Sequence, residues 1–153
     1  MQNRDGQTID SLIAALYETI SGPAGPRDWQ RERGLFAKGA ILLPAGPIPG
    51  TGAARSPAEI LDVEGYIASR APYFASNDLY EAEIARQTFR FGNTAHVLSA
   101  YAVRRRPDDA KPAWRGVNSI QLLHDGARWR IASIVWDNER PENPLPEWAD
   151  RAR

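Results

Sequence analysis

Cysteine is absent from the 153-residue chain, and so is an excess of charge of either sign. Without cysteine the chain has no disulfide bond, no thiolate nucleophile and no cysteine-ligated metal. The 19 lysine and arginine residues equal the 19 aspartate and glutamate residues in number. Because duplex nucleic acid and anionic membranes attract proteins mainly through positive charge, this balance argues against either as a partner.

Long hydrophobic runs are missing too. No apolar run approaches the roughly 20 residues of a membrane span, and the polar residues 1–5 lack the apolar core of a secretory signal. We therefore expect no membrane contact and a cytoplasmic location. The composition, with 42% hydrophobic and 25% charged residues, is that of a globular protein. The expected unit is a single domain over 1–153, with a core at about 8–137 and an extended, proline-rich tail at 138–153.

Three helices are predicted in the N-terminal half of the chain. Apolar residues recur at helical spacing over 9–20, and Thr8 is placed to cap that helix. A short second helix is predicted over 26–33, because proline stands at its start and glycine follows it. The third is predicted to begin at Ser56, where a capping serine, a proline and a glutamate follow in the order that starts helices. The proline- and glycine-rich residues 44–56 before it are predicted to form a surface loop.

Strands dominate the second half of the chain. Besides a short strand at 40–43, the predicted strands lie at about 80–91, 95–105, 114–123 and 129–137. Gly-Asn and Asp-Gly dipeptides separate the first two and the last two of these, and they favour the positive φ angles of tight hairpins. Helices followed by antiparallel strands indicate an α+β fold.

The last two strands carry apolar residues on both faces. Val117 and Leu123 share one parity of their strand, whereas Ile120 and Leu122 share the other. The strand at 129–137 shows the same pattern. One chain offers too few helices to cover both faces, so we expect a homodimer in which a partner subunit covers the second face. Whichever of Leu122 and Ile134 points outward is expected to belong to this interface.

In element order and in four short motifs, the chain resembles the nuclear transport factor 2-like superfamily. This cone-shaped α+β fold is shared by ketosteroid isomerase, scytalone dehydratase and the SnoaL-like polyketide cyclases. The motifs are LIAAL at 12–16, LFA at 35–37, FGNTAHV at 91–97 and DGARWRI at 125–131. The resemblance implies three N-terminal helices on a curved, mostly antiparallel sheet, a pocket for a small hydrophobic or polycyclic molecule, and dimerisation through the outer sheet face.

The chemistry that this resemblance implies is a cofactor-free proton transfer, such as a dehydration, an isomerisation or a cyclisation. The tyrosine and aspartate of the ketosteroid isomerases align best with Leu12 and Leu43, which disfavours the isomerase reaction. The late-strand acid of the SnoaL-like cyclases corresponds to Asp137, our first candidate base, for which a structural role at the strand end is the alternative. His96 is the second candidate, although its strand parity favours the outer face.

Ligand contacts are expected from an amide and from aromatic side chains. Asn118 lies inside a strand, where a buried amide orients a ligand or bonds within the sheet. The aromatic candidates, for which core packing is the alternative, are Tyr17, Trp29, Phe36, Tyr66 and Tyr73.

Two histidines on separate strands make a poor metal site, so we expect neither a metal nor a cofactor. The function is then either a small-molecule pocket protein with cofactor-free acid–base catalysis, or a non-catalytic ligand-binding or dimerisation module.

Overall fold

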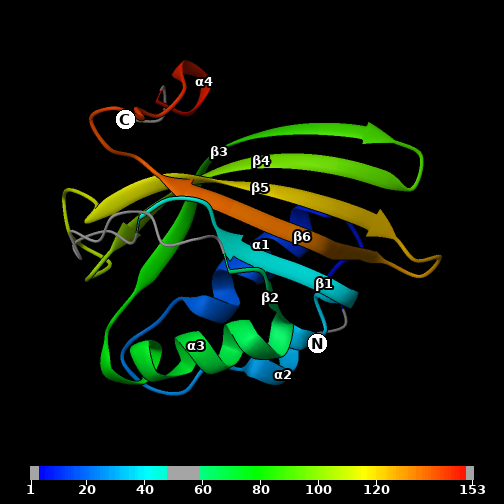
Figure 1. The fold of residues 1–153 in the computed structure, drawn as a ribbon, viewed down its shortest axis with the longest axis horizontal. Helices are drawn as coiled ribbons and strands as arrows, with labels where there is room; N and C mark the ends of the chain where they lie inside the picture. Colours follow the sequence, from blue (N-terminus) through cyan, green and yellow to red (C-terminus); the bar gives the residue numbers. More distant parts are fainter. Residues whose placement is uncertain (1–3, 48–58, 151–153) are drawn as a thin grey trace.

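The computed structural model describes residues 4–47 and 59–150. Its elements follow in the order α1 (Ile9–Ile20), α2 (Trp29–Arg33), β1 (Phe36–Pro44), β2 (Leu61–Asp62), α3 (Val63–Ser76), β3 (Tyr80–Phe91), β4 (Thr94–Arg104), β5 (Trp114–His124), β6 (Trp129–Asn138) and α4 (Glu147–Asp150). The six strands form one sheet in the order β2-β1-β6-β5-β4-β3. The β1–β6 pair is parallel and the other pairs are antiparallel. Figure 1 shows the curved sheet with α1, α2 and α3 on one side and α4 on the other.

The helix predicted over 9–20 is confirmed as α1. Thr8 caps it: its hydroxyl accepts from the Ser11 amide at 3.0 Å, and the Ser11 hydroxyl accepts from the Thr8 amide at 3.1 Å. This reciprocal pair satisfies amides that the first turn leaves free. The apolar stripe, which includes Leu12 and Ile13 at 0% exposure, packs into the core. Both the cap and the stripe are local features, so the sequence is sufficient to place this helix.

The helix predicted to start at Ser56 begins later. Residues 56–58 lie outside the described part of the chain, and 59–60 are not helical. Residues 61–62 are extended because they pair with β1 as β2, and the side chain of Asp62 then caps α3 by accepting from the Gly65 amide at 2.7 Å. Pairing with another strand therefore overrides the local helix signal.

The other helices differ from the prediction as well. The second starts at Trp29, three residues late, because Asp28 caps it through the Arg31 amide at 2.9 Å. The tail, predicted to be extended, forms a fourth helix, α4, whose Ala149 is fully buried and whose Asp150 pairs with Arg115 at 3.1 Å. No helix of the described ranges is both long and apolar enough to cross a membrane.

Both predicted hairpins are confirmed. In the β3–β4 turn the register ends at Phe91 opposite Thr94, and Gly92 has φ +56°. In the β5–β6 turn it starts at His124 opposite Trp129, and Gly126 has φ +96°. Side chains other than glycine rarely adopt such angles, which explains why these dipeptides signal the turns.

Bulges decide which side chains face the helices. In β6 the register shifts so that Ile131 pairs with Leu122 and Ser133 with Gln121, leaving Ala132 as the extra residue. Ile131 and Ile134 therefore both point inward, and they are 0% and 4% exposed. Leu122 also points inward at 3% exposure, so the expectation that it or Ile134 lies at an outer interface is wrong. Part of the apparent two-sided apolarity of this strand reflects the bulge.

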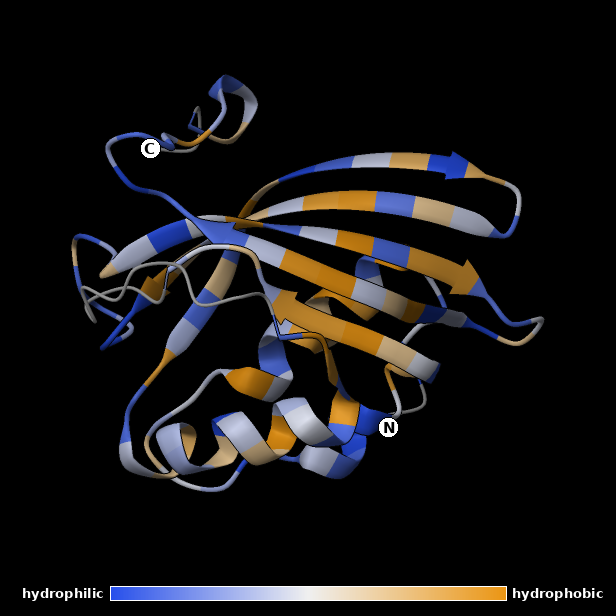
Figure 2. Cartoon of the chain, in the orientation of Figure 1, coloured by the Kyte–Doolittle hydropathy of each residue, from blue (hydrophilic) through white to orange (hydrophobic). Residues whose placement is uncertain are grey.

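The inner sheet face and the helices enclose the hydrophobic core. Figure 2 shows hydrophobic residues of β1, β5 and β6 side by side in the middle of the sheet. The core joins them to buried residues of α1 and α3, including Leu16, Ile67 and Phe74. At one end of this layer the core opens into a cavity.

Candidate functional site

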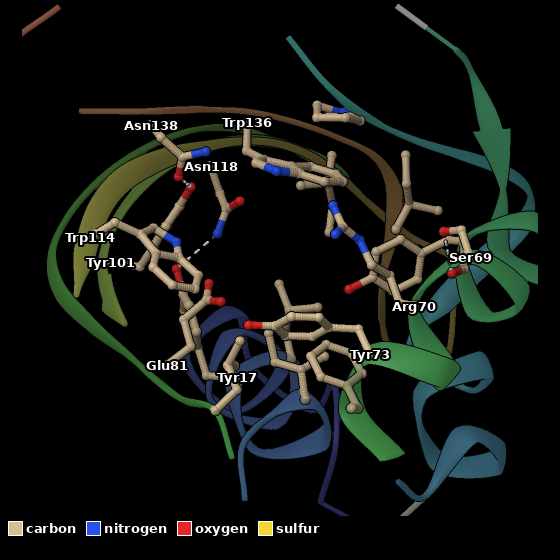
Figure 3. Close-up of a pocket in the computed structure, with 18 of the residues that line it drawn as sticks. Tyr17, Ser69, Arg70, Tyr73, Glu81, Tyr101, Trp114, Asn118, Trp136 and Asn138 are labelled. Atoms are coloured by element: carbon tan, nitrogen blue, oxygen red, sulfur yellow. Dashed lines mark hydrogen bonds between the residues drawn. The ribbon is translucent and has the colours of Figure 1, made fainter. Parts of the chain in front are cut away.

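A cavity of about 440 Å³ lies between the sheet and the helices, within the usual size range of small-molecule sites. The elements around it are α1, α2, α3 and the strands β1, β3, β4, β5 and β6. Seven aromatic side chains line it: Tyr17, Tyr66, Tyr73, Phe74, Tyr101, Trp114 and Trp136. Figure 3 shows Trp114 and Tyr101 across the cavity from Tyr73 and Arg70. Such walls favour a ligand with a flat, apolar body.

The aromatic walls are held by contacts between rings. Tyr66 and Trp136 meet edge to face, with ring centroids 6.2 Å apart. Tyr73 packs on Phe74 at 5.9 Å, and Trp29 supports Phe74 from outside the cavity at 5.8 Å. Rings packed in this way lose little freedom when a ligand binds, so the walls are largely preformed.

A chain of hydrogen bonds leads from the cavity along the inner face of the sheet to β3. The Asn118 amide nitrogen donates to the Tyr17 hydroxyl at 3.1 Å, and the Tyr17 and Ser99 hydroxyls are 2.6 Å apart. The Ser99 hydroxyl donates to the Glu83 carboxylate, which Arg86 holds at 2.8 Å. Because the Ser99 proton is directed at Glu83, the Tyr17 proton goes to Ser99. Tyr17 thus points its proton away from the cavity.

This chain also orients the amide of Asn118. Its nitrogen donates to Tyr17, so its oxygen, Oδ1, is the polar atom that faces the cavity. No side chain of the described ranges donates to this oxygen. Burial raises the pKa of Tyr17 far above its usual value, which keeps the phenol neutral and the direction of the chain constant. Asn118 therefore offers a ligand a hydrogen-bond acceptor.

A second hydrogen bond orients an amide on the neighbouring strand. The Tyr101 hydroxyl donates to Asn138 Oδ1 at 2.8 Å, which leaves the Asn138 amide nitrogen as a donor at the cavity. Tyr101 reaches Asn138 by passing over Gly116, where a β-carbon would lie 2.3 Å from the Tyr101 hydroxyl oxygen. A side chain at position 116 would displace the tyrosine, so this glycine is required by close approach.

Glu81 brings a carboxyl group into the cavity from the start of β3. Its backbone is clamped by Ser21, whose hydroxyl donates to the Glu81 carbonyl at 2.9 Å and accepts from its amide at 3.0 Å. No hydrogen-bond donor among residues 4–47 and 59–150 reaches its carboxylate. Burial raises the pKa of Glu81 to about 8, and the positive charge of Arg70 offsets only part of this effect.

Two arginines line the cavity, and they differ in how they are held. Arg105 donates to the Tyr73 hydroxyl at 2.6 Å, and its guanidinium stacks over Trp114 at 5.2 Å. Arg70, on α3, makes neither a hydrogen bond nor an ion pair with any residue that the structure describes. In Figure 3 Arg70 enters from the α3 side, facing Glu81 and Asn118.

A second carboxyl, that of Glu32 on α2, lines the cavity and is 1% exposed. Its Oε2 atom has no hydrogen-bond partner in the described part of the chain. Burial raises the pKa of Glu32 to about 7, more than the neighbouring Arg33 lowers it. Within the described ranges, no group of three or more histidine, aspartate or glutamate residues is placed to hold a metal ion.

The predicted ligand residues fall into two groups. Tyr17, Tyr66, Tyr73 and Asn118 line the cavity. Trp29 lies behind Phe74, and Phe36 is buried in the core at 6% exposure. Both residues therefore take the alternative role, that of core packing.

The two predicted bases lie outside the cavity lining. Asp137 has the opposite parity to Trp136 and Asn138, which line the cavity, and its carboxylate binds Arg140 at 2.7 Å. His96 lies on the outer sheet face, where its Nε2 is 3.0 Å from the Ser119 hydroxyl. His96 thus lies on the face that its strand parity predicts, and Asp137 takes the structural role at the strand end that was its alternative.

Sequence reasoning missed Glu32, Arg70 and Glu81. Each is a charged residue inside a helix or a strand, and no motif distinguishes it from a solvated surface residue. Glu81 carries a partial signal. It pairs with Val103 of β4, and paired residues of neighbouring strands point to the same face, so the buried Val103 indicates an inward side chain for Glu81. Their convergence depends on how α2, α3 and β3 pack.

Comparison with known proteins shows the fold. No protein-family model matches the chain, and no curated protein matches its sequence. A protein of unknown function with a cystatin-like fold from Nostoc punctiforme matches with TM-score 0.65 and 15% identity over 90% of this chain and 92% of its own. A suggested dehydratase of the NTF2-like family from Streptomyces avermitilis has TM-score 0.63 and 14% identity over 89% and 96%. A suggested association domain of a calcium/calmodulin-dependent protein kinase type II from Thiobacillus denitrificans has TM-score 0.67 and 12% identity over 88% and 98%.

Proposed function

We propose that this chain, which has the cystatin-like, NTF2-like fold, binds a small and largely apolar molecule in its cavity and catalyses a cofactor-free proton transfer on it. The reaction class is that of a dehydratase, an isomerase or a cyclase. One observation carries the proposal: an aromatic cavity of about 440 Å³ contains a carboxyl group, that of Glu81, with no hydrogen-bond donor among the described residues.

The acid–base role falls to Glu81 in place of Asp137 and His96. A proton-transfer catalyst works best when its pKa lies near the working pH, and the pKa of Glu81 is about 8. The protonated carboxyl is a general acid below this pH, and the carboxylate is a general base above it. The amide nitrogen of Asn138 supplies a neutral donor for charge that develops on a ligand oxygen, in place of Tyr17.

The alternative function is a non-catalytic ligand-binding or dimerisation module. The structure from Thiobacillus denitrificans, which is named as a suggested association domain, supports this alternative. An open cavity with titratable groups supports catalysis over a purely structural role, because a purely structural core gains nothing from burying carboxyl groups.

The ligand-binding part of the proposal predicts that blocking the cavity mouth abolishes binding. N-phenyl-1-naphthylamine, a neutral dye that fluoresces in apolar surroundings, is expected to bind the wild-type protein at one site per chain. Ser69 is an exposed residue of α3 at the lining of the cavity, so Ser69→Trp is expected to place an indole across the mouth. We expect the dissociation constant of the dye to rise about tenfold or more, measured by fluorescence titration.

Ala68→Trp is the matched control. Ala68 is the preceding residue of α3, is also exposed and does not line the cavity, so this variant is expected to bind the dye as the wild type does. A wild-type protein that does not bind the dye, or equal loss of binding in both variants, would contradict the proposed site.

We also propose that two copies of the chain pair through the outer sheet face. Phe89 and Phe91 are 58% and 89% exposed there, and the smaller apolar residues Val117, Leu123 and Val135 are half-buried beside them. The residues between them, including His96 and Gln121, are neutral or weakly basic, so two identical faces meet without strong charge repulsion. These side chains form a self-complementary surface for an isologous dimer.

The assembly proposal predicts that a charge at position 89 splits the dimer. Sedimentation of the wild type at micromolar concentration is expected to show about twice the chain mass of 17.0 kDa, and Phe89→Glu is expected to sediment as a monomer. Thr88→Glu, an exposed neighbour of opposite parity, serves as the control and should stay dimeric. A monomeric wild type would contradict the proposed dimer.

A further inference from the structure

Resting on the proposed function and deepening it, we propose that the ligand is a small organic acid. Its carboxylate pairs with Arg70, and its apolar body lies against the aromatic walls of the cavity. The proposal thus names both the chemical class of the ligand and its direction in the site.

Arg70 is the group that requires explanation. A guanidinium has five N–H donors and stays charged at any working pH, so burying it without a partner is costly. Arg70 is partly buried at the cavity, and the structure shows no hydrogen bond or ion pair to it from residues 4–47 and 59–150. Arg105, the other arginine of the lining, already has Tyr73 and Trp114 as partners. Arg70 is therefore the cation prepared for a ligand.

Glu81 is not the ion-pair partner of Arg70. A close ion pair would bring its carboxylate oxygen within 4 Å of the Arg70 nitrogens, and no such pair occurs. A carboxylate held by a guanidinium also has a pKa below its usual value, whereas the pKa of Glu81 is raised. Arg70 influences Glu81 through space and stays available.

The charge balance of the lining favours an anion. Its titratable groups are Arg70, Arg105, Glu32, Glu81 and tyrosines, and burial keeps the phenols of Tyr66 and Tyr101 neutral. Because burial also raises the pKa of both carboxyl groups, to about 7 and about 8, they carry less than their full charge near neutral pH. The two arginines then leave the cavity positive.

The opposite wall fixes the direction of the ligand. Asn118 presents its Oδ1 acceptor there, beside the carboxyl group of Glu81, and Figure 3 shows both across the cavity from Arg70. A ligand carboxylate at that wall would meet the oxygen of Asn118, an acceptor that repels it. The carboxylate is thus directed to Arg70, which can accommodate it in a bidentate pair, and the rest of the ligand faces Glu81.

The experiment compares two competitors that share their rings, one charged and one neutral. 2-Naphthoate and 2-naphthamide have the same rings and nearly the same size, and each is titrated against bound N-phenyl-1-naphthylamine. With the wild type we expect 2-naphthoate to displace the dye at a concentration about tenfold or more below that of 2-naphthamide. The reason is that a hydrogen bond between charged groups is stronger than one to the neutral amide. In Arg70→Gln this preference should vanish while 2-naphthamide and the dye bind as before.

Lys111→Gln is the control for net charge, because Lys111 is exposed and lies outside the lining. It should keep the preference for 2-naphthoate. Equal affinity of the wild type for the two competitors, or an unchanged preference in Arg70→Gln, would overturn the assignment of Arg70 while dye binding still supports the cavity. Failure of the dye to bind the wild type would overturn the proposed site itself, and this inference with it.

Discussion

Glu81→Gln is expected to lower the rate of proton abstraction in the cavity by about 100-fold to 10,000-fold, the usual contribution of a positioned acid or base. The measurement needs no knowledge of the natural substrate. 5-Nitrobenzisoxazole loses its carbon-bound proton to a base, the electrons of that C–H bond form a nitrile, and the N–O bond breaks to give a coloured phenolate. Its size suits a cavity of about 440 Å³. Glutamine keeps the shape of the side chain and removes the base.

The pH dependence follows from the same residue. The base is the ionised form of Glu81, whose pKa is raised to about 8 because burial disfavours the charge. The wild-type rate is therefore expected to rise with pH and to level off above a midpoint near 8. A glutamate of ordinary pKa would already have reached its plateau near neutral pH.

Asp137→Asn separates the two candidate bases. Asp137 is bound to Arg140 outside the cavity, so this variant should keep the wild-type rate and pH profile. A loss of rate in Asp137→Asn with none in Glu81→Gln would contradict the assignment of the base. A wild type with no rate above that of buffer would contradict the catalytic part of the proposal and leave ligand binding standing.

Glu32→Gln is expected to stabilise the protein at alkaline pH. The folded protein raises the pKa of Glu32 from 4.5 to about 7, so the folded state binds this proton more tightly than the unfolded state. The contribution of this proton to the free energy of unfolding is therefore fully present below pH 4.5, and it is lost as the pH rises through 7. The linkage amounts to about 3 kcal/mol at pH 8, and glutamine removes it because it does not ionise.

Urea unfolding at pH 4.5 and at pH 8 tests this prediction. We expect the variant and the wild type to differ little at the lower pH, and the variant to be more stable by up to about 3 kcal/mol at the higher pH. Glu64→Gln is the control, since Glu64 is exposed, and the Arg33 guanidinium lowers its pKa instead of raising it. The same stability difference at both pH values would show that burial does not raise the pKa of Glu32.

Several parts of this protein follow from short stretches of sequence. The cap and apolar stripe of α1 involve residues within three or four positions of one another, and the hairpin turns depend on glycines with positive φ. Such features are decided by local sterics and hydrogen bonds, so the sequence alone is sufficient to predict them. The order of these elements then indicates the α+β fold, and solved structures of the same fold agree.

Other parts depend on contacts between distant residues. The start of α3 moved to Val63 because Leu61 and Asp62 pair with β1, and no local signal reveals that pairing. The bulge in β6 reversed the parity after Ile131, which put Ile134 inside and made the sequence overstate the second apolar face. A one-residue shift exchanges the two faces of a strand, so parity arguments hold only between bulges.

The sequence by itself determined the elements of the sheet hairpins, the first helix, the overall fold and four of the residues at the cavity. Tertiary structure alone decided the chemistry, because it brought Arg70 from α3, Glu32 from α2 and Glu81 from β3 to one cavity. The physical reason is that a charged side chain acquires its role from its surroundings. Burial raises the pKa of the two glutamates, and Arg70 meets no ion-pair partner among residues 4–47 and 59–150. Arg140, in contrast, holds the carboxyl of Asp137, the base that the sequence favoured, outside the cavity lining.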